Sequence, residues 1–389
     1  MNESAPPTLR ILGTRGIPAA HGGFETFAEQ LALYLVQHGW RVVVYCQEKG
    51  LGKLREDSWR KVERVIVPVA GESPAATILF DWQSLRHAAR YGDLCLTLGY
   101  NTAVLSAWLR LKGVPNVFNM DGVEWRRPKW SSAVKFWFWM NDWAACWLGN
   151  HLIADHPQIA RHLESRVAAS KISTIAYGAP RLSNIDDTAI RKLGLTPRRY
   201  LTVIARAEPE NSLLEIVKGF SQRRRNVTLA VLGHYHDHHP YHAAVRAAAS
   251  DEVVFLGAIY DKATVAALRF HCLAYLHGHQ VGGTNPSLVE ALGAANAVIA
   301  HDNRFNRWVA GSGAKYFNGG EDLSALLDDV LDNPTLLAQM RAASIERFET
   351  DFTLDTILTQ YRTLLESWLP STSGFAALQP RAQVNKSNS

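Results

Sequence analysis

The chain of 389 residues has few cysteines and no large excess of charge of either sign. Its four cysteines are scattered, form no CxxC pair and each lie in an apolar run, at Cys46, Cys95, Cys146 and Cys272. We therefore expect reduced core residues rather than disulfides or a zinc site. The formal charge of +5 at pH 7 is compatible with nucleic acid, anionic lipid or phosphorylated substrates and selects none of them.

Three further absences narrow the class of protein. No run of Lys and Arg is interleaved with stacking aromatic residues at the spacing of a strand, so we expect no nucleic-acid partner. No basic segment followed by an apolar stretch and a cleavage site opens the chain, which predicts a cytoplasmic protein. No Asp-x-Asp pair follows a predicted strand, so we expect no metal to bridge to a diphosphate. The residues therefore favour a protein without a metal or other cofactor.

The composition that is present describes a globular protein. Hydrophobic residues make up 47% of the chain and charged residues 20%, and the length is sufficient for two domains with their own cores. Residues 1–7 and 370–389 lack apolar periodicity and are rich in Ser, Pro and Asn. We expect these two ends to be disordered tails.

Short apolar or β-branched runs, typical of buried parallel strands, alternate with helical patterns along almost the whole chain. In the first half the predicted strands are 8–13, 41–46, 62–67, 93–98, 115–119, 151–154 and 171–175, and the predicted helices include 24–38, 76–91, 101–112, 131–148 and 155–165. In the second half the predicted strands are 200–205, 227–232, 253–256, 272–276 and 296–300, and the predicted helices include 321–331, 335–348 and 353–368. This alternation predicts an α/β protein with two Rossmann-like domains, residues 8–184 and 185–369.

Ligands of open α/β sheets bind beyond the carboxyl ends of the strands, so the loops after strands are the first candidates for a site. The loop after the first predicted strand contains Gly22 and Gly23 directly before a helix. Bare backbone at a helix N-terminus suits an anion or a sugar phosphate, although a glycine turn needed only for folding is an equal alternative. The spacing is not that of the dinucleotide fingerprint, which argues against a nicotinamide-dependent oxidoreductase.

The corresponding loop of the second half follows the predicted strand 272–276. Gly282 and Gly283 give a bare turn, and Thr284 or Asn285 can cap the helix that Pro286 begins. Free N–H groups there can hold a diphosphate, and a carboxylate one turn further on, at Glu290, can accept hydrogen bonds from a ribose diol. The alternative is a capped helix with a surface Glu. In either case we expect Glu290 outside the core, so that its loss leaves the fold intact.

Four long segments, in this order, carry a family resemblance: GTRGIPAAHGGFETFAEQL, NMDGVEWRRPKW, FLGAIYDKATVAALR and HGHQVGGTNPSLVEAL. Residues 9–368 resemble the bacterial rhamnosyltransferase branch of glycosyltransferase family 4, enzymes of capsule and exopolysaccharide assembly. The resemblance implies the GT-B fold, in which two facing Rossmann-like domains enclose a cleft and a C-terminal helix returns toward the N-terminal domain. It also implies retaining, metal-independent transfer from dTDP-β-L-rhamnose to a saccharide on undecaprenyl diphosphate.

The resemblance assigns roles to individual residues. It makes Asp121, Glu124 and Arg206 the candidate catalytic residues, with Arg206 neutralising the leaving diphosphate and Asp121 orienting the acceptor or supporting positive charge on the sugar. An Asp that only caps a turn before Gly122 is an equal alternative. The candidate donor-binding residues are Arg15, Gly22, Gly23, Asn211, His279, Gly283, Thr284, Asn285, Pro286, Ser287 and Glu290.

Two positions depart from the family pattern. Glu290 matches the second carboxylate of the E-x7-E motif, but the first position holds Gly282. The first Glu commonly holds hydroxyls of a donor hexose, so its absence is compatible with a deoxy sugar. The position of a second diphosphate cation holds polar or acidic residues, among them Glu208 and Asn211. A sugar-nucleotide epimerase and a catalytically inactive binding subunit therefore stay open as alternatives.

Two unusual clusters remain. The segment HYHDHHPYH, from His234 to His242, is rich enough in histidine to suggest a metal, but its spacing fits no standard zinc pattern and favours a solvated loop. The segment from Trp125 to Trp147 holds six of the twelve tryptophans, with Arg126, Arg127, Lys129 and Lys135 nearby. Such a composition predicts peripheral docking on the cytoplasmic membrane leaflet, with a core helix as the alternative.

Overall fold

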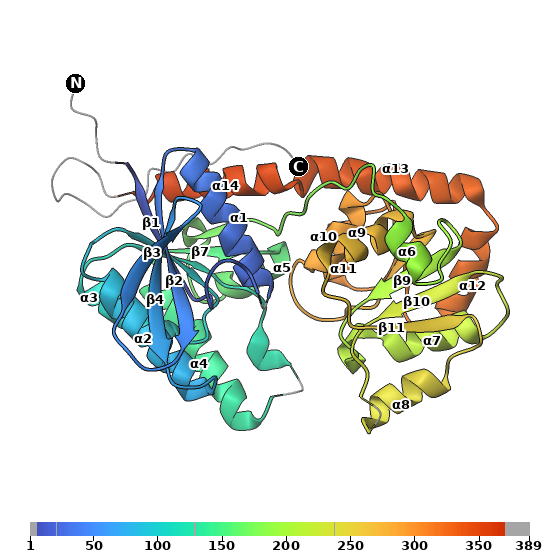
Figure 1. Ribbon diagram of the computed structural model, residues 1–389, viewed down its shortest axis with the longest axis horizontal. Coiled ribbons are helices and arrows are strands. Elements are labelled where there is room, and N and C mark those ends of the chain that lie inside the picture. Colours follow the sequence, from blue (N-terminus) through green and yellow to red (C-terminus); the bar gives the residue numbers. More distant parts are fainter. Residues whose placement is uncertain (1–5, 21, 128–129, 237, 370–389) are drawn as a thin grey trace. The chain divides into compact units, whose positions relative to one another are not determined.

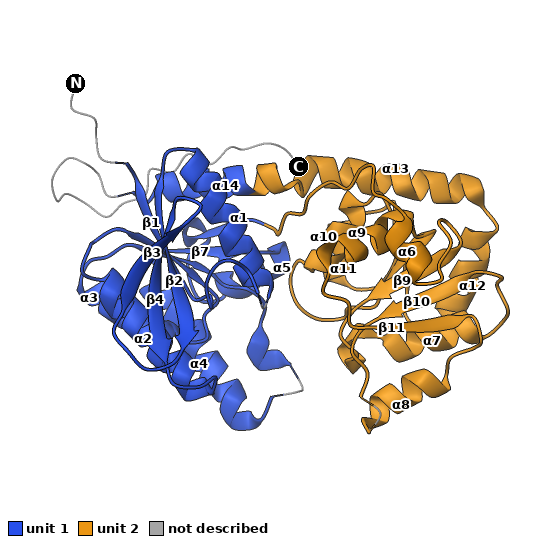
Figure 2. Ribbon diagram, viewed as in Figure 1, with its two compact units in different colours: residues 1–175, 358–389 blue, residues 176–357 orange. Residues whose placement is uncertain are grey.

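The computed structural model describes residues 6–20, 22–127, 130–236 and 238–369 (Figure 1). They form two compact units, residues 1–175 with 358–389 and residues 176–357 (Figure 2). Each unit is a parallel α/β sheet with helices, so the predicted pair of Rossmann-like domains is confirmed. The sequence places the domain boundary at residues 184 and 185 and leaves residues 358–369 in the second domain, whereas contacts assign these last residues to unit 1.

Unit 1 contains the first eight strands. Its elements, in chain order, are β1 (Thr8–Leu12), α1 (Gly23–Gln37), β2 (Arg41–Lys49), β3 (Arg55–Trp59), β4 (Val62–Val69), α2 (Pro74–Ala88), β5 (Leu94–Leu98), η1 (Ala103–Ser106), α3 (Ala107–Leu111), β6 (Asn116–Asn119), η2 (Glu124–Arg126), α4 (Ser132–Leu148), β7 (His151–Ala154), α5 (Pro157–Glu164), η3 (Ala169–Lys171) and β8 (Ile172–Thr174).

The sheet of unit 1 has the order β3-β4-β2-β1-β5-β6-β7-β8, and only β3 runs antiparallel to its neighbour. Successive strand residues point to opposite faces, so Val43 and Tyr45 of β2 reach the same cluster as Phe80 of α2 and Leu109 of α3. The chain leaves β1 toward β2 on one side and enters β5 on the other. The point between β1 and β5 is therefore the topological switch of this sheet, where α/β proteins bind ligands.

Unit 2 contains the remaining strands. Its elements are α6 (Thr188–Lys192), β9 (Tyr200–Ile204), η4 (Pro209–Asn211), α7 (Leu213–Ser221), β10 (Thr228–Leu232), α8 (Pro240–Ala247), β11 (Val253–Gly257), α9 (Lys262–His271), β12 (Ala274–His277), α10 (Pro286–Gly293), β13 (Ala297–His301), α11 (Arg304–Ala310), β14 (Lys315–Phe317), α12 (Gly320–Leu331), α13 (Pro334–Asp351) and the start of α14 (Leu354–Glu366).

The sheet of unit 2 is parallel throughout and has the order β11-β10-β9-β12-β13-β14. Its core joins Val203 of β9 and Leu276 of β12 to Phe220 of α7 and Leu327 of α12. The chain moves outward from β9 through β10 to β11, and then returns to β12 on the other side of β9. The switch point of unit 2 therefore lies between β9 and β12.

The C-terminal helix α14 ends in unit 1, as expected of a helix that returns to the N-terminal domain. The ring of the buried Tyr361 of α14 packs against that of Phe27 of α1, with centroids 4.7 Å apart and planes inclined by 53°. The Tyr361 hydroxyl accepts a 2.7 Å hydrogen bond from the side chain of Asn119. These contacts give residues 358–369 a physical reason to belong to unit 1.

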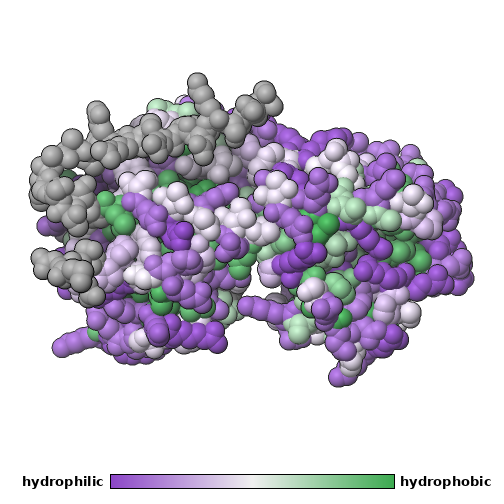
Figure 3. Space-filling view, turned by 90° about the horizontal axis from the view of Figure 1, so that it is seen from above, coloured by the Kyte–Doolittle hydropathy of each residue, from purple (hydrophilic) through white to green (hydrophobic). Residues whose placement is uncertain are grey.

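On the face shown in Figure 3, hydrophilic residues predominate and hydrophobic ones form scattered groups.

All the predicted strands are present, and the structure adds the short strands β3 and β14. The predicted helix 101–112 is instead the 3-10 turn η1 followed by α3. All four cysteines are buried and unpaired, as expected. The predicted tails lie outside the described residues except for Pro6 and Pro7. Pro7 does not belong to a tail, because its carbonyl accepts a 2.9 Å hydrogen bond from the backbone of Arg41.

Candidate functional site

At the switch point of unit 2, the loop after β9 is tied to the loop after β12. The ring Nδ1 of His279 lies 2.6 Å from Oδ1 of Asn211, and the Asn211 amide donates to the carbonyl of Arg206 at 2.9 Å. The hydroxyl of Ser212 donates to the carbonyl of Gly278 at 2.7 Å. The structure thus brings together Arg206, Asn211 and His279, which the sequence predicts as site residues.

Gly278 is required for this close approach. A Cβ atom at Gly278 would lie 2.0 Å from the carbonyl oxygen of Asn211, a distance at which the backbone would have to shift. The two loops therefore meet through bare backbone, and any side chain at this position would separate them.

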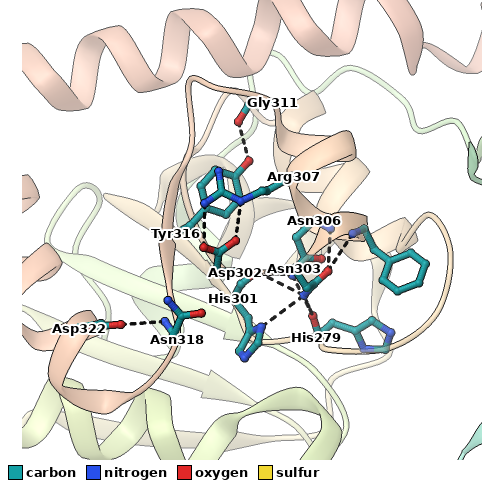
Figure 4. Close-up of polar contacts among 11 residues, drawn as sticks. His279, His301, Asp302, Asn303, Asn306, Arg307, Gly311, Tyr316, Asn318 and Asp322 are labelled. Carbon is teal, nitrogen blue, oxygen red and sulfur yellow. Dashed lines mark hydrogen bonds and ion pairs between the residues drawn. The ribbon is translucent and has the colours of Figure 1, made fainter. Parts of the chain in front are cut away.

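The loop after β13 supports the same region from a third strand (Figure 4). The side-chain amide of Asn303 donates to the carbonyl of His279 at 3.0 Å, and that of Asn306 donates to the same carbonyl at 2.8 Å. Asn306 also donates to the carbonyl of His301 at 2.8 Å. Sequence reasoning missed these two asparagines, although the polar run HDNRFN directly after a buried strand is the signal that could have indicated them.

The same loop is braced on its other side. Arg307 forms a bidentate ion pair with Asp302, at 2.5 and 2.7 Å, and its guanidinium lies 4.5 Å from the centre of the Tyr316 ring (Figure 4). Asn318 donates its backbone N–H to Asp322 at 3.2 Å. Asn303 and Asn306, which bind the carbonyl of His279, thus belong to a segment that the Asp302–Arg307 ion pair also holds in place.

The helix after the β12 loop begins as predicted, with Asn285 as its cap. The Asn285 side chain accepts from the N–H of Ser287 at 2.9 Å, and Pro286 has no N–H. Pro286 and Ser287 therefore have no free backbone N–H to offer to a diphosphate. Thr284 is buried and lies inside the loop.

Glu290 has a partner that the sequence does not reveal. Its carboxylate lies 2.5 Å from the guanidinium of Arg269, which also donates to the hydroxyl of Ser287 at 3.0 Å. The Arg269 side chain is 8% exposed and that of Glu290 is 41% exposed. Glu290 therefore lies outside the core and reaches solvent, as a ribose ligand must. It also pairs with a buried cation, so we now expect its loss to cost some stability.

Gly282 occupies the position of the missing first carboxylate, and its backbone conformation explains why a glycine stands there. Its φ is +117°, in the region that disfavours every residue with a side chain, and a Cβ atom would lie 3.2 Å from Nε2 of His279. A glutamate here would strain the turn. Gly283 continues the bare turn.

Arg206 is exposed at the end of the β9 loop and forms no ion pair with any residue that the structure describes. An unpaired guanidinium beside the Asn211–His279 junction is available to an anionic ligand. Its role as the diphosphate cation stays a prediction that this placement favours.

The histidine segment is partly structural. The ring of His242 is buried, where Nδ1 accepts from the N–H of His236 at 2.8 Å and Nε2 faces the carbonyl of Ala207 at 2.8 Å. Because one nitrogen accepts, the other must carry the proton and donate. A wholly solvated loop is therefore wrong for His242. No group of metal-ligating side chains is found among the described residues, and Asp237 lies outside them.

In unit 1, the loop after β1 is shaped by two glycines that the sequence does not single out. Gly13 has a φ of +77° and would place a Cβ atom 2.3 Å from the carbonyl of Leu98, and Gly16 has a φ of +124° and packs on Cys46. The backbone N–H groups of Ala19 and Ala20 donate to Glu29 and Glu25 at 2.7 and 3.3 Å. The loop is therefore folded onto α1, which begins at Gly23.

Gly22 and Gly23 themselves have no such packing reason. A Cβ atom at either position would meet no described atom within 4 Å, and Gly22 has extended backbone that any residue adopts. The alternative of a glycine turn needed for folding therefore loses its support. Bare backbone at the start of α1 is consistent with a ligand contact, and the donor-binding role of both glycines stays a prediction.

A pocket of about 710 Å³ lies at the switch point of unit 1. Its wall combines the ends of β1 and β5, from Leu12 to Arg15 and from Thr97 to Gly99, with side chains of α2, η1 and α4. Arg15 is exposed at this wall, while Asp81 of α2 lies within it. No sequence motif marks Asp81 as a site residue, because it lies in an ordinary helical pattern.

Asp121 and Glu124 lie together after β6. Asp121 has a φ of +52°, and the Tyr100 hydroxyl holds the turn by donating to the carbonyl of Gly122 at 3.0 Å and accepting from the N–H of Glu124 at 2.8 Å. Burial, and then the negative charge of Glu124, raise the pKa of Asp121 to about 6. Glu124 pairs with Arg127 at 3.1 Å. A carboxyl tuned to titrate near neutrality is typical of functional sites, though not restricted to them.

The aromatic segment divides between the interior and the surface. Trp125 donates to the buried Asp142 at 2.8 Å, Trp137 donates to the carbonyl of Asn101 at 2.8 Å, and both rings are partly buried. The exposed rings of α4 are instead Phe136, Trp139 and Trp147, exposed to 63%, 42% and 63%. The aromatic rings expected at the membrane are Trp137, Trp139, Trp143 and Trp147. Trp137 and Trp143 are only partly exposed, and Phe136 joins the exposed rings. Among the basic residues, Arg127 is paired with Glu124, and Lys129 lies outside the described residues. No described helix is long and apolar enough to cross a membrane.

Comparison with known proteins agrees with this architecture. The Glycosyl transferase 4-like domain matches residues 22–178, and no curated protein matches the chain. Sucrose-phosphate synthase from Thermosynechococcus elongatus has 16% identity and a TM-score of 0.77 over 92% of this chain and 98% of that one. HepE of Anabaena, solved in complex with UDP, has 16% identity and a TM-score of 0.73 over 93% and 100%.

A third similar structure is the alpha,alpha-trehalose-phosphate synthase (UDP-forming) of Burkholderia xenovorans, with 12% identity and a TM-score of 0.69 over 92% of this chain and 99% of that one. At these identities the likeness shows the fold, and the matched domain supplies the activity. The chain is a glycosyltransferase with the GT-B fold, and its residues 22–178 match the glycosyl transferase 4-like domain.

Proposed function

We propose that this enzyme transfers L-rhamnose from dTDP-β-L-rhamnose to a saccharide carried on undecaprenyl diphosphate, with retention and without a metal, in exopolysaccharide or capsule assembly. The observation that carries the choice of donor is Gly282. At a φ of +117° it supplies no side chain where relatives commonly place a carboxylate on the hydroxyls of a donor hexose. A donor that lacks a hydroxyl loses least from that absence.

The magnitude is sufficient to separate donors. A hydrogen bond from a hydroxyl to a charged group contributes about 1.5–3 kcal/mol, which corresponds to roughly a tenfold to hundredfold difference in use of the donor. A second candidate donor is UDP-glucose, because HepE of Anabaena has been solved in complex with UDP-glucose. Gly282 argues against it for this chain.

The leaving group defines the rest of the proposed chemistry. A sugar nucleotide departs as a diphosphate, whose developing charge needs cations and N–H groups in place before the reaction. We assign this role to Arg206, which no described carboxylate neutralises. Front-face attack lets the departing phosphate take the acceptor proton, so no separate base is needed, and Asp121 orients the acceptor or supports positive charge on the sugar.

The acceptor side of the proposal includes the membrane. A polyprenyl-linked saccharide keeps its lipid in the cytoplasmic leaflet, so the enzyme must work at that surface. The rings of Phe136 and Trp139 stack 5.8 Å apart, and Trp143 and Trp147 continue the row at 5.2 Å. Aromatic side chains at headgroup depth are typical of peripheral proteins.

The deciding experiment is a panel of nucleotide sugars incubated with the enzyme and a membrane extract that contains lipid-linked saccharides, with release of the nucleoside diphosphate as the readout. We expect turnover with dTDP-β-L-rhamnose that persists in EDTA, and at least tenfold less turnover with UDP-glucose. Preference for UDP-glucose would overturn the donor assignment, and loss of activity in EDTA with recovery in manganese would overturn the metal-free mechanism.

A further inference from the structure

The pocket of unit 1 contains one acid and one base in a mainly apolar wall. The apolar part includes Phe80 and Leu85 of α2 and the rings of Trp130, Trp137 and Phe138. Asp81 and Arg15 are its acid and base. Burial is the main influence on the pKa of Asp81 and raises it to about 6, a hydrogen bond from Thr102 lowers it, and no neighbouring charge contributes.

Asp81 has one partner and one unused oxygen. The hydroxyl of Thr102 donates to Oδ2 of Asp81 at 2.7 Å, and no described residue donates to Oδ1 or forms an ion pair with this side chain. A half-satisfied carboxyl in an apolar pocket is costly unless a ligand completes its hydrogen bonds. The wall also includes Gln47, whose Oε1 is buried and accepts no hydrogen bond from any described residue.

The free oxygen of Asp81 and the ring of Trp137, which is held by its bond to Asn101, suit a ligand with a hydroxyl donor and an apolar C–H face. A saccharide has both. The pocket also lies at the carboxyl ends of β1 and β5, where α/β proteins bind ligands, which favours a ligand site over a packing defect.

We propose that Asp81 sets the charge selectivity for the acceptor: its free carboxylate oxygen accepts a hydrogen bond from a hydroxyl of a neutral sugar, and its charge rejects a sugar that carries a carboxylate there. This inference rests on the proposed function, because it takes the acceptor to be a saccharide. It makes Asp81 a specificity-determining residue of unit 1.

The electrostatics of the pocket leave this role to Asp81. Charged side chains on α2 or on elements packed against it are Arg10, Glu63, Arg64, Arg86, His87 and Arg110, and none of them lines the pocket. Arg15 lines it but is exposed to solvent, which screens its charge. Selectivity should therefore follow the titration of a single carboxyl.

The experiment measures binding of octyl hexosides and their uronic acid counterparts, each as a matched gluco, galacto and manno pair, by isothermal titration and tryptophan fluorescence. For the pair that binds best at pH 7.5, we expect at least a tenfold preference for the neutral member. Asp81→Asn should reduce that preference to below threefold. Glu72→Gln, which removes an exposed charge just before α2 outside the pocket, should leave it unchanged.

The pH dependence separates selectivity from a structural role. In the parent the preference should fall as pH drops below about 6, where Asp81 becomes protonated while a uronate stays charged. Thr102→Val removes the bond that lowers this pKa and should move the fall to higher pH, and Thr102→Ser should restore it. Absence of binding by all three pairs, or an unchanged preference in folded Asp81→Asn, would overturn the inference.

The same preparations distinguish this inference from the proposed function. Slow hydrolysis of dTDP-β-L-rhamnose without any acceptor reports use of the donor alone, and it should be equal in the parent and in Glu72→Gln. If the parent uses no dTDP-rhamnose while the neutral sugar preference depends on Asp81, the donor proposal fails and the pocket assignment stands. If the donor is used while Asp81→Asn keeps full selectivity, the donor proposal stands and the pocket assignment fails.

Discussion

Nδ1 of His279 lies 2.6 Å from Oδ1 of Asn211, so one side-chain hydrogen bond joins the loops after β9 and β12 at the switch point of unit 2. Both residues hold backbone as well: Asn211 bonds the carbonyl of Arg206, and the carbonyl of His279 is bonded by Asn303 and Asn306. Neither loop can move without breaking bonds in the other. This is the preorganised geometry that binding of a nucleotide sugar requires.

Asn211→Ala should therefore weaken donor binding as well as folding. The change removes two hydrogen bonds of a buried side chain, which we expect to lower the free energy of unfolding by about 1–3 kcal/mol. The KM for the donor should rise roughly tenfold or more, while acceptor binding to unit 1 is unchanged. Urea unfolding and steady-state kinetics measure the two effects, and equal donor KM in parent and variant would remove this junction from the site.

Arg206→Ala should lower kcat without lowering stability. The guanidinium is exposed and forms no ion pair with a described residue, so its removal leaves no group unsatisfied. Losing one charge-stabilising group aimed at a leaving diphosphate costs about 100- to 1,000-fold in rate. The matched control is Arg224→Ala, an exposed arginine of unit 2 whose contact with Asp251 is 3.7 Å long. Equal kcat values in the two variants would refute the role of Arg206.

Glu290→Ala should damage both the donor site and the fold. The variant leaves the Arg269 guanidinium, 8% exposed, without its ion-pair partner. Because Glu290 itself is 41% exposed, solvent screens the pair, and we expect a loss of about 1–2 kcal/mol rather than the larger cost of a fully buried pair. Arg269→Met with Glu290→Ala should recover stability but not donor binding. Thermal unfolding of both variants checks the first effect, and donor titration the second.

Asp121→Asn should change how stability depends on pH. The folded-state pKa of Asp121, about 6, lies above its ordinary value of 3.8, so the folded state binds a proton more readily than the unfolded state. Stability from this group is present below pH 4 and is lost as pH rises toward 6 and above. The variant lacks that loss. Between pH 4 and pH 8 its free energy of unfolding should therefore rise by about 3 kcal/mol relative to that of the parent, as measured by urea unfolding at the two pH values. Asn tolerates the positive φ at this position.

The fold could be predicted from the sequence because buried parallel strands are short continuous apolar runs, as in LAVL of β10 or AVIA of β13. The strand β3 was not predicted because its sequence, REDSW, is charged, as that of an exposed edge strand can be. The loop residues of unit 2 could be predicted because glycines and polar residues after a buried strand have no packing purpose.

Residues that act through long-range contacts could not be predicted. Arg269 and Glu290 meet only when α9 and α10 pack beside each other, and Asn119 meets Tyr361 across 242 positions of the chain. Asp81 has the same property: its importance comes from what surrounds it in the pocket, which the pattern of α2 does not contain. Periodicity also failed on α4, where both faces are aromatic and only packing decides which rings reach solvent.

The last prediction concerns the surface of α4. Phe136, Trp139 and Trp147 are exposed on one helix, and Leu111 of α3 and Leu79 of α2 are exposed to 79% and 45% on elements that pack with η1 near α4. If unit 1 docks on the cytoplasmic leaflet, replacing the three rings by Ser should release the enzyme from vesicles that contain anionic lipid. Replacing Tyr260 of unit 2, which is 88% exposed, should not.

The basic residues supply the smaller part of this binding. With Arg127 paired to Glu124, Arg126 and Lys135 remain, and each contributes about 1 kcal/mol near an anionic surface. Arg126→Gln with Lys135→Gln should therefore weaken vesicle binding roughly tenfold or more, and high salt should mimic this effect but not that of the triple ring variant. Transfer to a short water-soluble acceptor should persist in all variants. If the triple variant sediments with vesicles as the parent does, the α4 surface is not the docking face.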